Sequence, residues 1–163
     1  GYYKDPIRTK SVFTEDGWFR TNDIAVKDEK GRYFIKGRNN NMILGPSGEN
    51  IYPEEIESVI NNVDGVNESI VVERNGRLVA LVQLDENMIE WDKEGEDNFY
   101  EKLDAMKEKI QKMVNKNVNK TSQVSSVEVM KEPFEKTATQ KIRRFKYKDS
   151  APTVEEESKS KGE

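Results

Sequence analysis

The stretch that decides the fold of this chain of 163 residues is Gly37-Arg38-Asn39-Asn40-Asn41-Met42-Ile43-Leu44-Gly45-Pro46-Ser47-Gly48-Glu49-Asn50-Ile51-Tyr52-Pro53-Glu54-Glu55-Ile56-Glu57. Its first pair, Gly-Arg, closes a predicted strand. The loop that follows is rich in Asn, Gly, Ser and Pro, which favour turns and local side-chain hydrogen bonds. Pro53 suits the first position of a helix, where no backbone N–H is needed. On these grounds alone, the stretch fits an ordinary strand–loop–helix connection as well as it fits a functional motif.

Before this stretch, residues 17–37 read as a β-hairpin with its turn at Asp28-Glu29-Lys30-Gly31. After it, residues 53–62 read as a helix, because apolar residues recur there at helical spacing. Residues 68–73 and 77–84 are predicted strands joined at Asn75-Gly76, a strong signal for a two-residue hairpin turn. Both strands are apolar on both faces, so the sheet needs cover on both sides.

A longer helix is predicted over residues 98–118, after an acidic loop at residues 86–97, and a third strand over residues 124–130. The sequence therefore predicts an α+β fold: a small mixed sheet of about three strands with helices on both faces, preceded by the β-hairpin. A lone hairpin is marginal in water, so we expect residues 17–37 to depend on packing against another part of the protein.

Composition excludes several classes of chemistry. The chain has no Cys and no His, which removes disulfides, thiol nucleophiles, Ser-His-Asp catalysis and His or Cys metal sites. Lys and Arg number 27 against 31 Asp and Glu, so net charge gives no reason to expect nucleic acid as a partner. No apolar run approaches the ~20 residues that span a bilayer, and no signal peptide is recognised. The absence of Cys agrees with a cytoplasmic location.

Three stretches in order resemble the acyl-adenylate-forming enzymes, a family that includes acyl-CoA synthetases, peptide-synthetase adenylation domains and beetle luciferases. The Gly-Arg pair, the Gly-containing loop and Pro-x-Glu-Ile-Glu are similar to the hinge region of that family. Trp18-Phe19-Arg20-Thr21-Asn22-Asp23 is similar to its Trp-Phe/Tyr-x-Thr-Gly-Asp motif. Pro133-Phe134-Glu135-Lys136-Thr137-Ala138-Thr139-Gln140-Lys141-Ile142-Arg143-Arg144 is similar to its closing motif, Pro-x-Thr-x-x-Gly-Lys-x-x-Arg. The resemblance covers roughly residues 1–148.

The resemblance implies two nucleotide-binding residues. Asp23 takes the position that accepts hydrogen bonds from the ribose hydroxyls of ATP, a task that suits an acceptor-only carboxylate. Arg38 takes the position that contacts the nucleotide on its ribose and phosphate side, where a planar fork of donors is effective. On its own, Asp23 also fits a structural role in capping the hairpin. Arg38 on its own also fits an ordinary solvated charge. Asn22 stands where the family usually has Gly, and Asn tolerates a left-handed backbone.

The resemblance also implies three residues that serve the reaction. Lys141 takes the position of the catalytic lysine that bridges the acyl carboxylate and the α-phosphate, with Gln140 in place of the usual Gly. Asn40 takes the hinge position, where the family has Asp or Lys, and Gly48 takes the position that lines the tunnel for coenzyme A. A Gly needed only for its turn explains Gly48 about as well. No metal-binding residue is predicted in this chain.

We therefore expect the C-terminal part of a long-chain-type fatty acyl-CoA synthetase. Its substrates would be a fatty acid, ATP with Mg²⁺, and CoA, bound largely through an N-terminal domain that lies outside this chain. Residues 1–37 would be the tail of that large domain, 38–41 the hinge, 42–148 the mobile C-terminal domain and 149–163 a disordered tail. The chain begins at Gly1 without a Met, which suggests a piece of a longer protein that is inactive alone.

Two other functions remain open. The first is an adenylating enzyme for another carboxylate, such as an amino or aryl acid. The second is a module without enzymatic activity that binds anions through the basic residues of 131–148, and it predicts strongly salt-dependent binding to nucleic acid.

Overall fold

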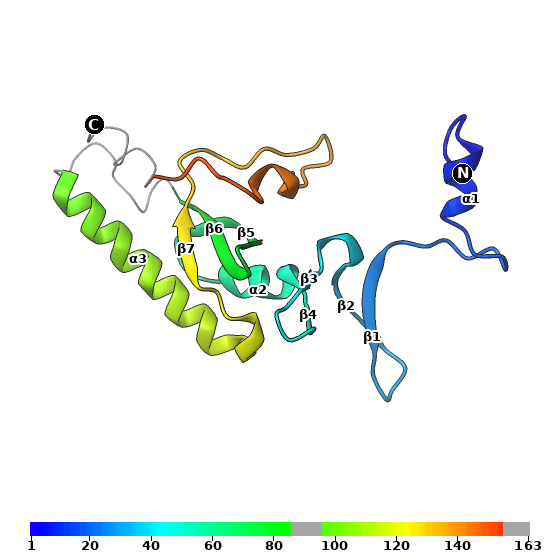
Figure 1. Ribbon diagram of the computed structural model, residues 1–163, viewed down its shortest axis with the longest axis horizontal. Coiled ribbons are helices and arrows are strands. Elements are labelled where there is room, and N and C mark those ends of the chain that lie inside the picture. Colours follow the sequence, from blue (N-terminus) through cyan, green and yellow to red (C-terminus); the bar gives the residue numbers. More distant parts are fainter. Residues whose placement is uncertain (86–95, 155–163) are drawn as a thin grey trace. The chain divides into compact units, whose positions relative to one another are not determined.

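The computed structural model describes residues 1–85 and 96–154, with only the backbone described for residues 96–98 (Figure 1). The chain divides into two compact units, residues 1–42 and the residues from 43 onward. The first unit contains helix α1 (Pro6–Ser11), strands β1 (Asp23–Lys27) and β2 (Tyr33–Arg38), and the 3₁₀ helix η1 (Asn39–Asn41). The division of the chain into a domain tail, a hinge and a mobile domain stays a prediction.

The second unit contains the remaining elements. These are β3 (Ile43–Leu44), β4 (Asn50–Ile51), α2 (Pro53–Ile60), β5 (Val66–Arg74), β6 (Arg77–Leu84), α3 (Glu96–Asn117), η3 (Lys120–Ser122), β7 (Ser126–Val129) and η4 (Arg144–Tyr147). Most of the predicted acidic loop, residues 86–95, lies outside the described residues. Within the described ranges, no helix combines the length and the apolar character needed to cross a bilayer.

In the first unit, β1 and β2 form an antiparallel hairpin in which Asp23 faces Arg38. Its turn is closed by Asp28, whose carboxylate accepts hydrogen bonds from the backbone N–H groups of Lys30 and Arg32. The first strand starts later than the sequence predicts, at Asp23 instead of near Trp18. The reason is local: Asn22 takes a left-handed conformation with φ of 61°, which interrupts the extended chain.

The first unit has no buried apolar side chain, since Gly37 is the only residue of 1–42 that is fully buried. Its aromatic and aliphatic side chains lie on the surface instead, and both Trp18 and Ile35 are 73% exposed. A two-stranded hairpin without a core has little to hold it together in water.

The second unit is built around a mixed sheet with strand order β5-β6-β7 (Figure 1). β5 and β6 are antiparallel, and β6 and β7 are parallel. Asn75 and Gly76 both have positive φ, 51° and 73°, as a two-residue hairpin turn requires. The predicted α+β fold with a mixed sheet of three strands is therefore confirmed.

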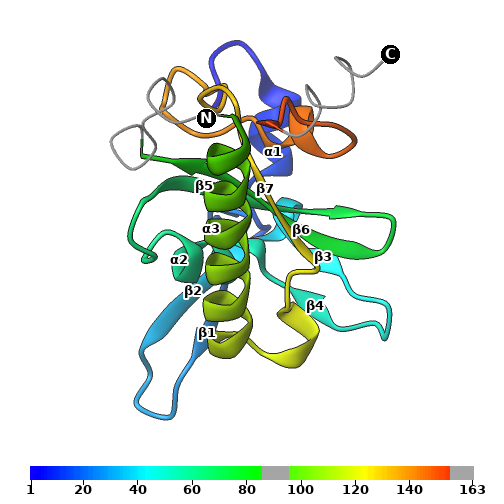
Figure 2. The same ribbon diagram turned by 90° about the vertical axis from the view of Figure 1, so that its left-hand side faces the viewer.

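One face of the sheet packs against α2 and α3 (Figure 2). Alternate residues of the strands point to this face, among them Val71, Ala80 and Val82. They meet Ile56 and Ile60 of α2 and the apolar stripe of α3, which includes Leu103, Ile110 and Val114. These helix and sheet residues form the larger core of the molecule.

The opposite face is covered by the segment that follows β7, which includes η4. Ile70, Val72, Val79 and Leu81 point to this face and pack against Met130, Phe134, Tyr147 and Ala151. The cover that the apolar strands require is thus supplied here by a 3₁₀ helix and the loops around it.

The predicted disordered tail, residues 149–163, is wrong in its first part. Thr153 forms an antiparallel bridge with Met130, and the N–H of Lys131 donates to the carbonyl of Pro152 at 3.0 Å. Ala151 and Val154 are buried, one against each core. The segment has few apolar residues, but their burial and the backbone bonds order it. Residues 155–163 lie outside the described part of the chain.

Candidate functional site

The two predicted nucleotide-binding residues lie side by side in the first unit. Asp23 and Arg38 are cross-strand partners in β1 and β2, and Arg38 Nε lies 3.4 Å from Asp23 Oδ1. Both residues are exposed, so each keeps free hydrogen-bonding positions. The arrangement can present a carboxylate acceptor and a guanidinium donor to one ligand.

The predicted hinge residue, Asn40, is the middle residue of η1 and is exposed. The helix is tied to the hairpin, because the N–H of Asn39 donates to the carbonyl of Asn22 at 2.9 Å. The boundary between the two compact units falls just after it, between Met42 and Ile43. The assignment of a hinge to Asn40 itself stays a prediction.

Gly48 lies in the short loop between β3 and β4. Its φ is +83°, and a side chain added there would meet no atom within 4 Å. The Gly48 N–H donates to the carbonyl of Gly45 at 2.9 Å, and Glu49 folds back so that its carboxylate accepts from the N–H of Ser47. A side chain at Gly45 would come within 2.1 Å of that carboxylate. The loop is therefore closed on itself, with an open surface at Gly48.

A groove of about 430 Å³ runs beside this loop. Its walls come from the β3–β4 loop, the β5–β6 turn and the segment before β7; they include Leu44, Ser47, Arg77, Thr121 and Gln123. Both apolar and polar groups face it. The predicted CoA-lining loop thus forms one wall of a surface groove.

Lys141 lies at the tip of a hairpin-like loop. Lys136 and Ile142 form an antiparallel bridge at its base, and the N–H of Thr137 donates to the carbonyl of Lys141 at 2.8 Å. The Thr137 hydroxyl accepts from the N–H of Lys141 at 3.2 Å. Gln140 supplies the tight turn with φ of 60°, at the position where the resembling family has Gly. The lysine itself is exposed and forms no ion pair with a described residue.

An ion pair between a buried glutamate and a partly buried arginine holds the base of the Lys141 loop. Both oxygens of the Glu57 carboxylate, on α2, accept from the guanidinium of Arg144. Glu57 Oε1 also accepts from the backbone N–H of Val71 in β5 at 2.7 Å. Burial lowers the pKa of Arg144, but the hydrogen bond with Glu57 and the charges of Glu57 and Glu54 outweigh it, so the net pKa is raised. Arg144 therefore stays charged.

Further contacts attach the same loop to the sheet. Arg74 of β5 pairs with Glu128 at 2.8 Å and donates to the carbonyls of Tyr147 and Lys148. The Tyr147 hydroxyl accepts from the N–H of Glu135 at 2.7 Å, and the Tyr147 ring packs edge-on against Phe134. The frame around Lys141 is thus fixed at several points.

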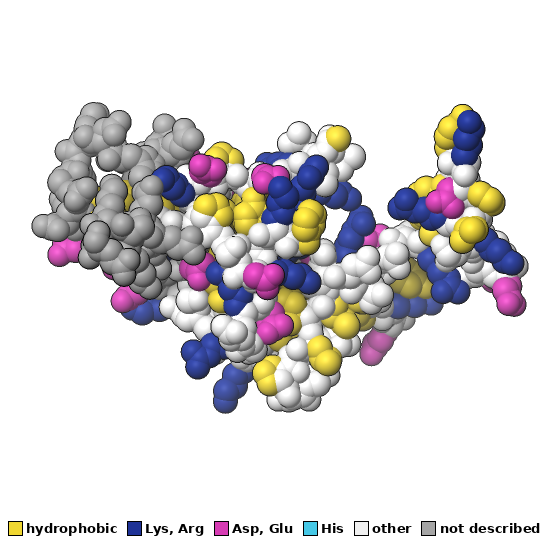
Figure 3. Space-filling model, turned by 45° about the horizontal axis from the view of Figure 1, so that its top comes forward, with side chains coloured by type: hydrophobic (Ala, Val, Ile, Leu, Met, Phe, Trp, Pro, Cys, Tyr) yellow, Lys and Arg dark blue, Asp and Glu magenta, His cyan; other side chains and the backbone are white. Residues whose placement is uncertain are grey.

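Acidic side chains neutralise much of the basic segment 131–148. Lys136 pairs with Glu68, Arg144 with Glu57 and Lys146 with Glu135. Figure 3 shows acidic side chains beside several of the basic ones on the face it presents. The pattern of charge gives little support to a general anion-binding surface.

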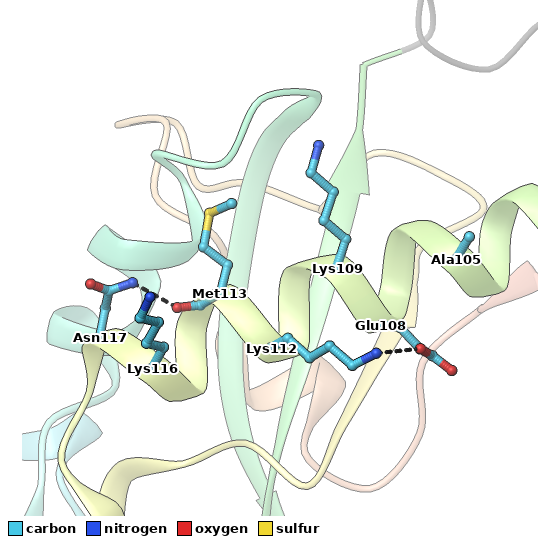
Figure 4. Close-up of a pocket in the computed structure, with 7 residues that line it drawn as sticks. All are labelled: Ala105, Glu108, Lys109, Lys112, Met113, Lys116 and Asn117. Atoms are coloured by element: carbon cyan, nitrogen blue, oxygen red, sulfur yellow. Dashed lines mark hydrogen bonds and ion pairs between the residues drawn. The ribbon is translucent and has the colours of Figure 1, made fainter.

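A second, shallow hollow lies along α3 (Figure 4). Its lining residues are Ala105, Glu108, Lys109, Lys112, Met113, Lys116 and Asn117. Glu108 and Lys112 pair one helical turn apart at 2.8 Å. Because every lining residue belongs to one helix face, the hollow has the character of a solvated helix surface.

Sequence reasoning missed Glu57 as a site residue. In the first turns of a helix, an acidic side chain is expected to complement the helix dipole. The partner of Glu57, Arg144, is 87 residues away, so no local pattern connects them. The available signal was the position of both residues inside the two motifs that resemble the family.

This chain is similar to known proteins in sequence. A family profile described as AMP-binding enzyme C-terminal domain matches residues 48–146. The chain is 43% identical over 93 residues to a long-chain-fatty-acid–CoA ligase of Mycobacterium tuberculosis, an alignment of 54% of this chain with 18% of that protein. It is 44% identical over 72 residues to a 2-succinylbenzoate–CoA ligase of Listeria monocytogenes, an alignment of 44% of this chain with 15% of that protein.

The fold is also found among solved structures. The o-succinylbenzoate coenzyme A synthetase of Bacillus subtilis in complex with AMP superposes with a TM-score of 0.69 at 22% identity, over 94% of this chain and 28% of that one. The chain spans less than a fifth of the length of the two curated relatives named above.

Proposed function

Because the chain belongs to the AMP-binding enzyme C-terminal domain family, we propose that it is the C-terminal part of an ATP-dependent CoA ligase. Such an enzyme would join a carboxylic acid to coenzyme A through an acyl-adenylate. The observation that carries the proposal is the Lys141 loop. It presents an exposed lysine at the tip of a tight turn whose base is fixed by the Glu57–Arg144 ion pair.

In the first step of the proposed reaction, the carboxylate attacks the α-phosphate of ATP, and pyrophosphate leaves. Negative charge builds on the reacting oxygens, and the Lys141 ammonium would stabilise it. Loss of one such donor typically costs about 2.7–4 kcal/mol of barrier. In the second step, the CoA sulfur attacks the acyl carbonyl, and AMP leaves.

Asp23 and Arg38 have the chemistry to hold the nucleotide. An exposed carboxylate can accept from two ribose hydroxyls, and a neighbouring guanidinium can donate to ribose or phosphate oxygens. Mg²⁺ usually binds one or two carboxylates together with the phosphates of the nucleotide. The described residues of this chain contain no cluster of three acidic side chains, and we propose no metal ligand among them.

The two steps need different groups at one reaction centre. Lys141 serves the adenylation step, whereas the open surface at Gly48 suits the pantetheine arm of CoA in the second step. A rotation of the second unit about Asn40 would present each loop in turn.

We propose a long-chain fatty acid as the carboxylate substrate and the cytoplasm as the location. The support for the acid is the resemblance of residues 47–57 to fatty acyl-CoA synthetases and the likeness to the mycobacterial long-chain ligase. An aryl acid is the competing candidate, since the listerial relative is a 2-succinylbenzoate–CoA ligase. Measuring acid-dependent ATP–pyrophosphate exchange with both acid classes in the full-length enzyme decides between them.

The test of the whole proposal is Lys141→Ala in the full-length enzyme that carries this chain. We expect acid-dependent pyrophosphate exchange to fall about 100- to 1000-fold, the equivalent of one lost transition-state donor. Thioester formation from supplied acyl-adenylate should be retained. Lys112→Ala, on the surface of α3, is the matched control. Equal loss of both half-reactions in Lys141→Ala would contradict the role of this residue.

A further inference from the structure

The Glu57–Arg144 pair occupies a special place in the chain. Glu57 lies on α2, which begins two residues after β4 and therefore directly follows the Gly48 loop. Arg144 lies three residues after Lys141, at the start of η4. The ion pair thus joins the segment with the proposed CoA-lining loop to the segment with the proposed catalytic lysine.

Hydrogen bonds hold both side chains of the pair in place. The Glu57 carboxylate is almost completely buried and accepts three hydrogen bonds, two from Arg144 and one from the Val71 backbone. A guanidinium bound by both outer nitrogens cannot rotate without losing a bond, so the fork fixes direction as well as distance. Val71 belongs to β5, so the carboxylate is itself anchored in the sheet.

The remaining bonds carry this constraint to Lys141. The Arg143 N–H donates to the carbonyl of Glu135 at 2.9 Å, and the Thr137 N–H donates to the carbonyl of Lys141. The segment from Lys141 to Arg143 is therefore paired with residues 135–137. A fixed Arg144, directly after this segment, orients the turn at its other end.

We propose that Glu57 and Arg144 are positioning residues, which act through Lys141 by fixing the loop that presents its ammonium. The proposal rests on the function proposed above. Neither residue needs to touch a substrate. A misplacement of about 1 Å at a reacting group can cost about 100-fold in rate, so a loosened loop would slow adenylation strongly even with Lys141 present.

The first experiment needs no substrate and uses the 163-residue chain. In Glu57→Gln, we expect the exchange of the Thr137, Gln140 and Lys141 amide hydrogens, followed by NMR, to accelerate at least about tenfold. Glu108→Gln is the control, because it removes the carboxylate of the Lys112 pair on the exposed surface of α3, away from the Lys141 loop. It should change the same amides less than about threefold.

A second variant covers the chance that Glu57→Gln does not fold, since it leaves Arg144 charged without its carboxylate. Glu57→Gln combined with Arg144→Met removes both charges, and replacing both partners of a buried pair is far better tolerated than removing one. This variant lacks the fork, so the same three amides should again exchange faster. Unchanged exchange in a folded variant overturns the proposal.

The second experiment uses the full-length enzyme. Glu57→Gln should lower kcat of pyrophosphate exchange about 100-fold while thioester formation from acyl-adenylate changes little. On a Lys141→Ala background, Glu57→Gln should cause no further loss, because residues that act as one unit are not additive. Additive losses, or equal loss of both half-reactions, overturn the positioning role. If Lys141→Ala alone spares adenylation, the proposed function fails. The amide hydrogen exchange of the 163-residue chain then still decides whether the Glu57–Arg144 pair holds the loop.

Discussion

Two single residues, Asn22 and Gln140, adopt left-handed conformations, with φ of 61° and 60°. Both stand where the resembling family usually has Gly, and Gly reaches this conformation without strain. The chain keeps the backbone of the motif at each site while changing the residue. The cost falls mainly on Gln140, since Asn visits this region more readily than most residues.

Gln140→Gly should therefore stabilise the isolated chain. Relief of the left-handed conformation is worth about 1–2 kcal/mol. The greater conformational freedom of Gly in the unfolded chain offsets about 0.4–1 kcal/mol of this gain in stability. A net gain of about 0.5–1 kcal/mol in the free energy of unfolding is expected from urea denaturation. Gln140→Ala is the control and should bring no gain, because Ala has the same conflict; a gain there would locate the effect in the side chain instead.

Glu135 gives a prediction for acidic pH. The hydrogen bond from Lys146 holds the pKa of the Glu135 carboxyl below its ordinary value of 4.5. Because the folded-state pKa is lowered, the pair stabilises the fold at pH values above 4.5. This contribution is lost as pH falls through the lowered value. In an NMR titration, Lys146→Met should move the pKa of Glu135 back up towards 4.5; an unmoved pKa would contradict the assignment to Lys146.

Two motifs that lie apart in the sequence predict Asp23 and Arg38 as nucleotide-binding residues. The structure pairs the two side chains across the hairpin, and their role in binding a nucleotide stays a prediction. Glu57 could not be found in the same way. A buried glutamate and an exposed one look alike in sequence, and only the fold brings Arg144 to it.

At the scale of elements, α3 contributes to the core through one stripe of side chains. Ile110 is fully buried on that stripe, whereas Met113 is 41% exposed. Ile110→Ala should lower the free energy of unfolding by about 2–5 kcal/mol, through lost burial and the cavity that remains. Met113→Ala on the same helix should change it by less than about 0.5 kcal/mol. Urea denaturation of both variants checks the assignment of the buried face, and similar losses would contradict it.

The main elements of the second unit followed from periodicity and turn chemistry. Apolar residues at helical spacing gave α2 and α3, and Asn75-Gly76 gave the hairpin of β5 and β6. Two features of the fold could not be predicted from the local sequence. The left-handed backbone of Asn22 delays the start of the first strand to Asp23. Residues 149–154 order on the sheet through backbone bonds to Met130 and Lys131, which composition does not report.

At the scale of the whole molecule, the two units differ in whether they bury their apolar side chains. The second unit buries two clusters on opposite faces of one sheet, while residues 1–42 bury none. Hydrogen exchange of the 163-residue chain should therefore show two levels of protection. Amides of β6 should exchange only through global unfolding, and amides of β1 and β2 should exchange through low-energy local opening. Equal protection of both would contradict this division.

The same chain tests the anion-binding alternative. Three of the basic side chains in 131–148 are paired with Glu57, Glu68 and Glu135. We therefore expect weak binding to DNA or RNA, with little dependence of affinity on salt concentration. Tight binding that falls steeply with added salt would indicate many phosphate contacts and would favour the alternative.

β6 lies between β5 and β7 in the sheet, and these two neighbours are synthesised at very different times. Its neighbour β5 precedes it across a two-residue turn, so this hairpin can form within microseconds of leaving the ribosome. Its other neighbour, β7, emerges only after all of α3, and the Lys141 loop follows β7. The proposed catalytic lysine thus reaches its place only after the three strands of the sheet have been synthesised. A chain that stops short of β7 lacks the third strand of the sheet and the whole loop that holds this lysine.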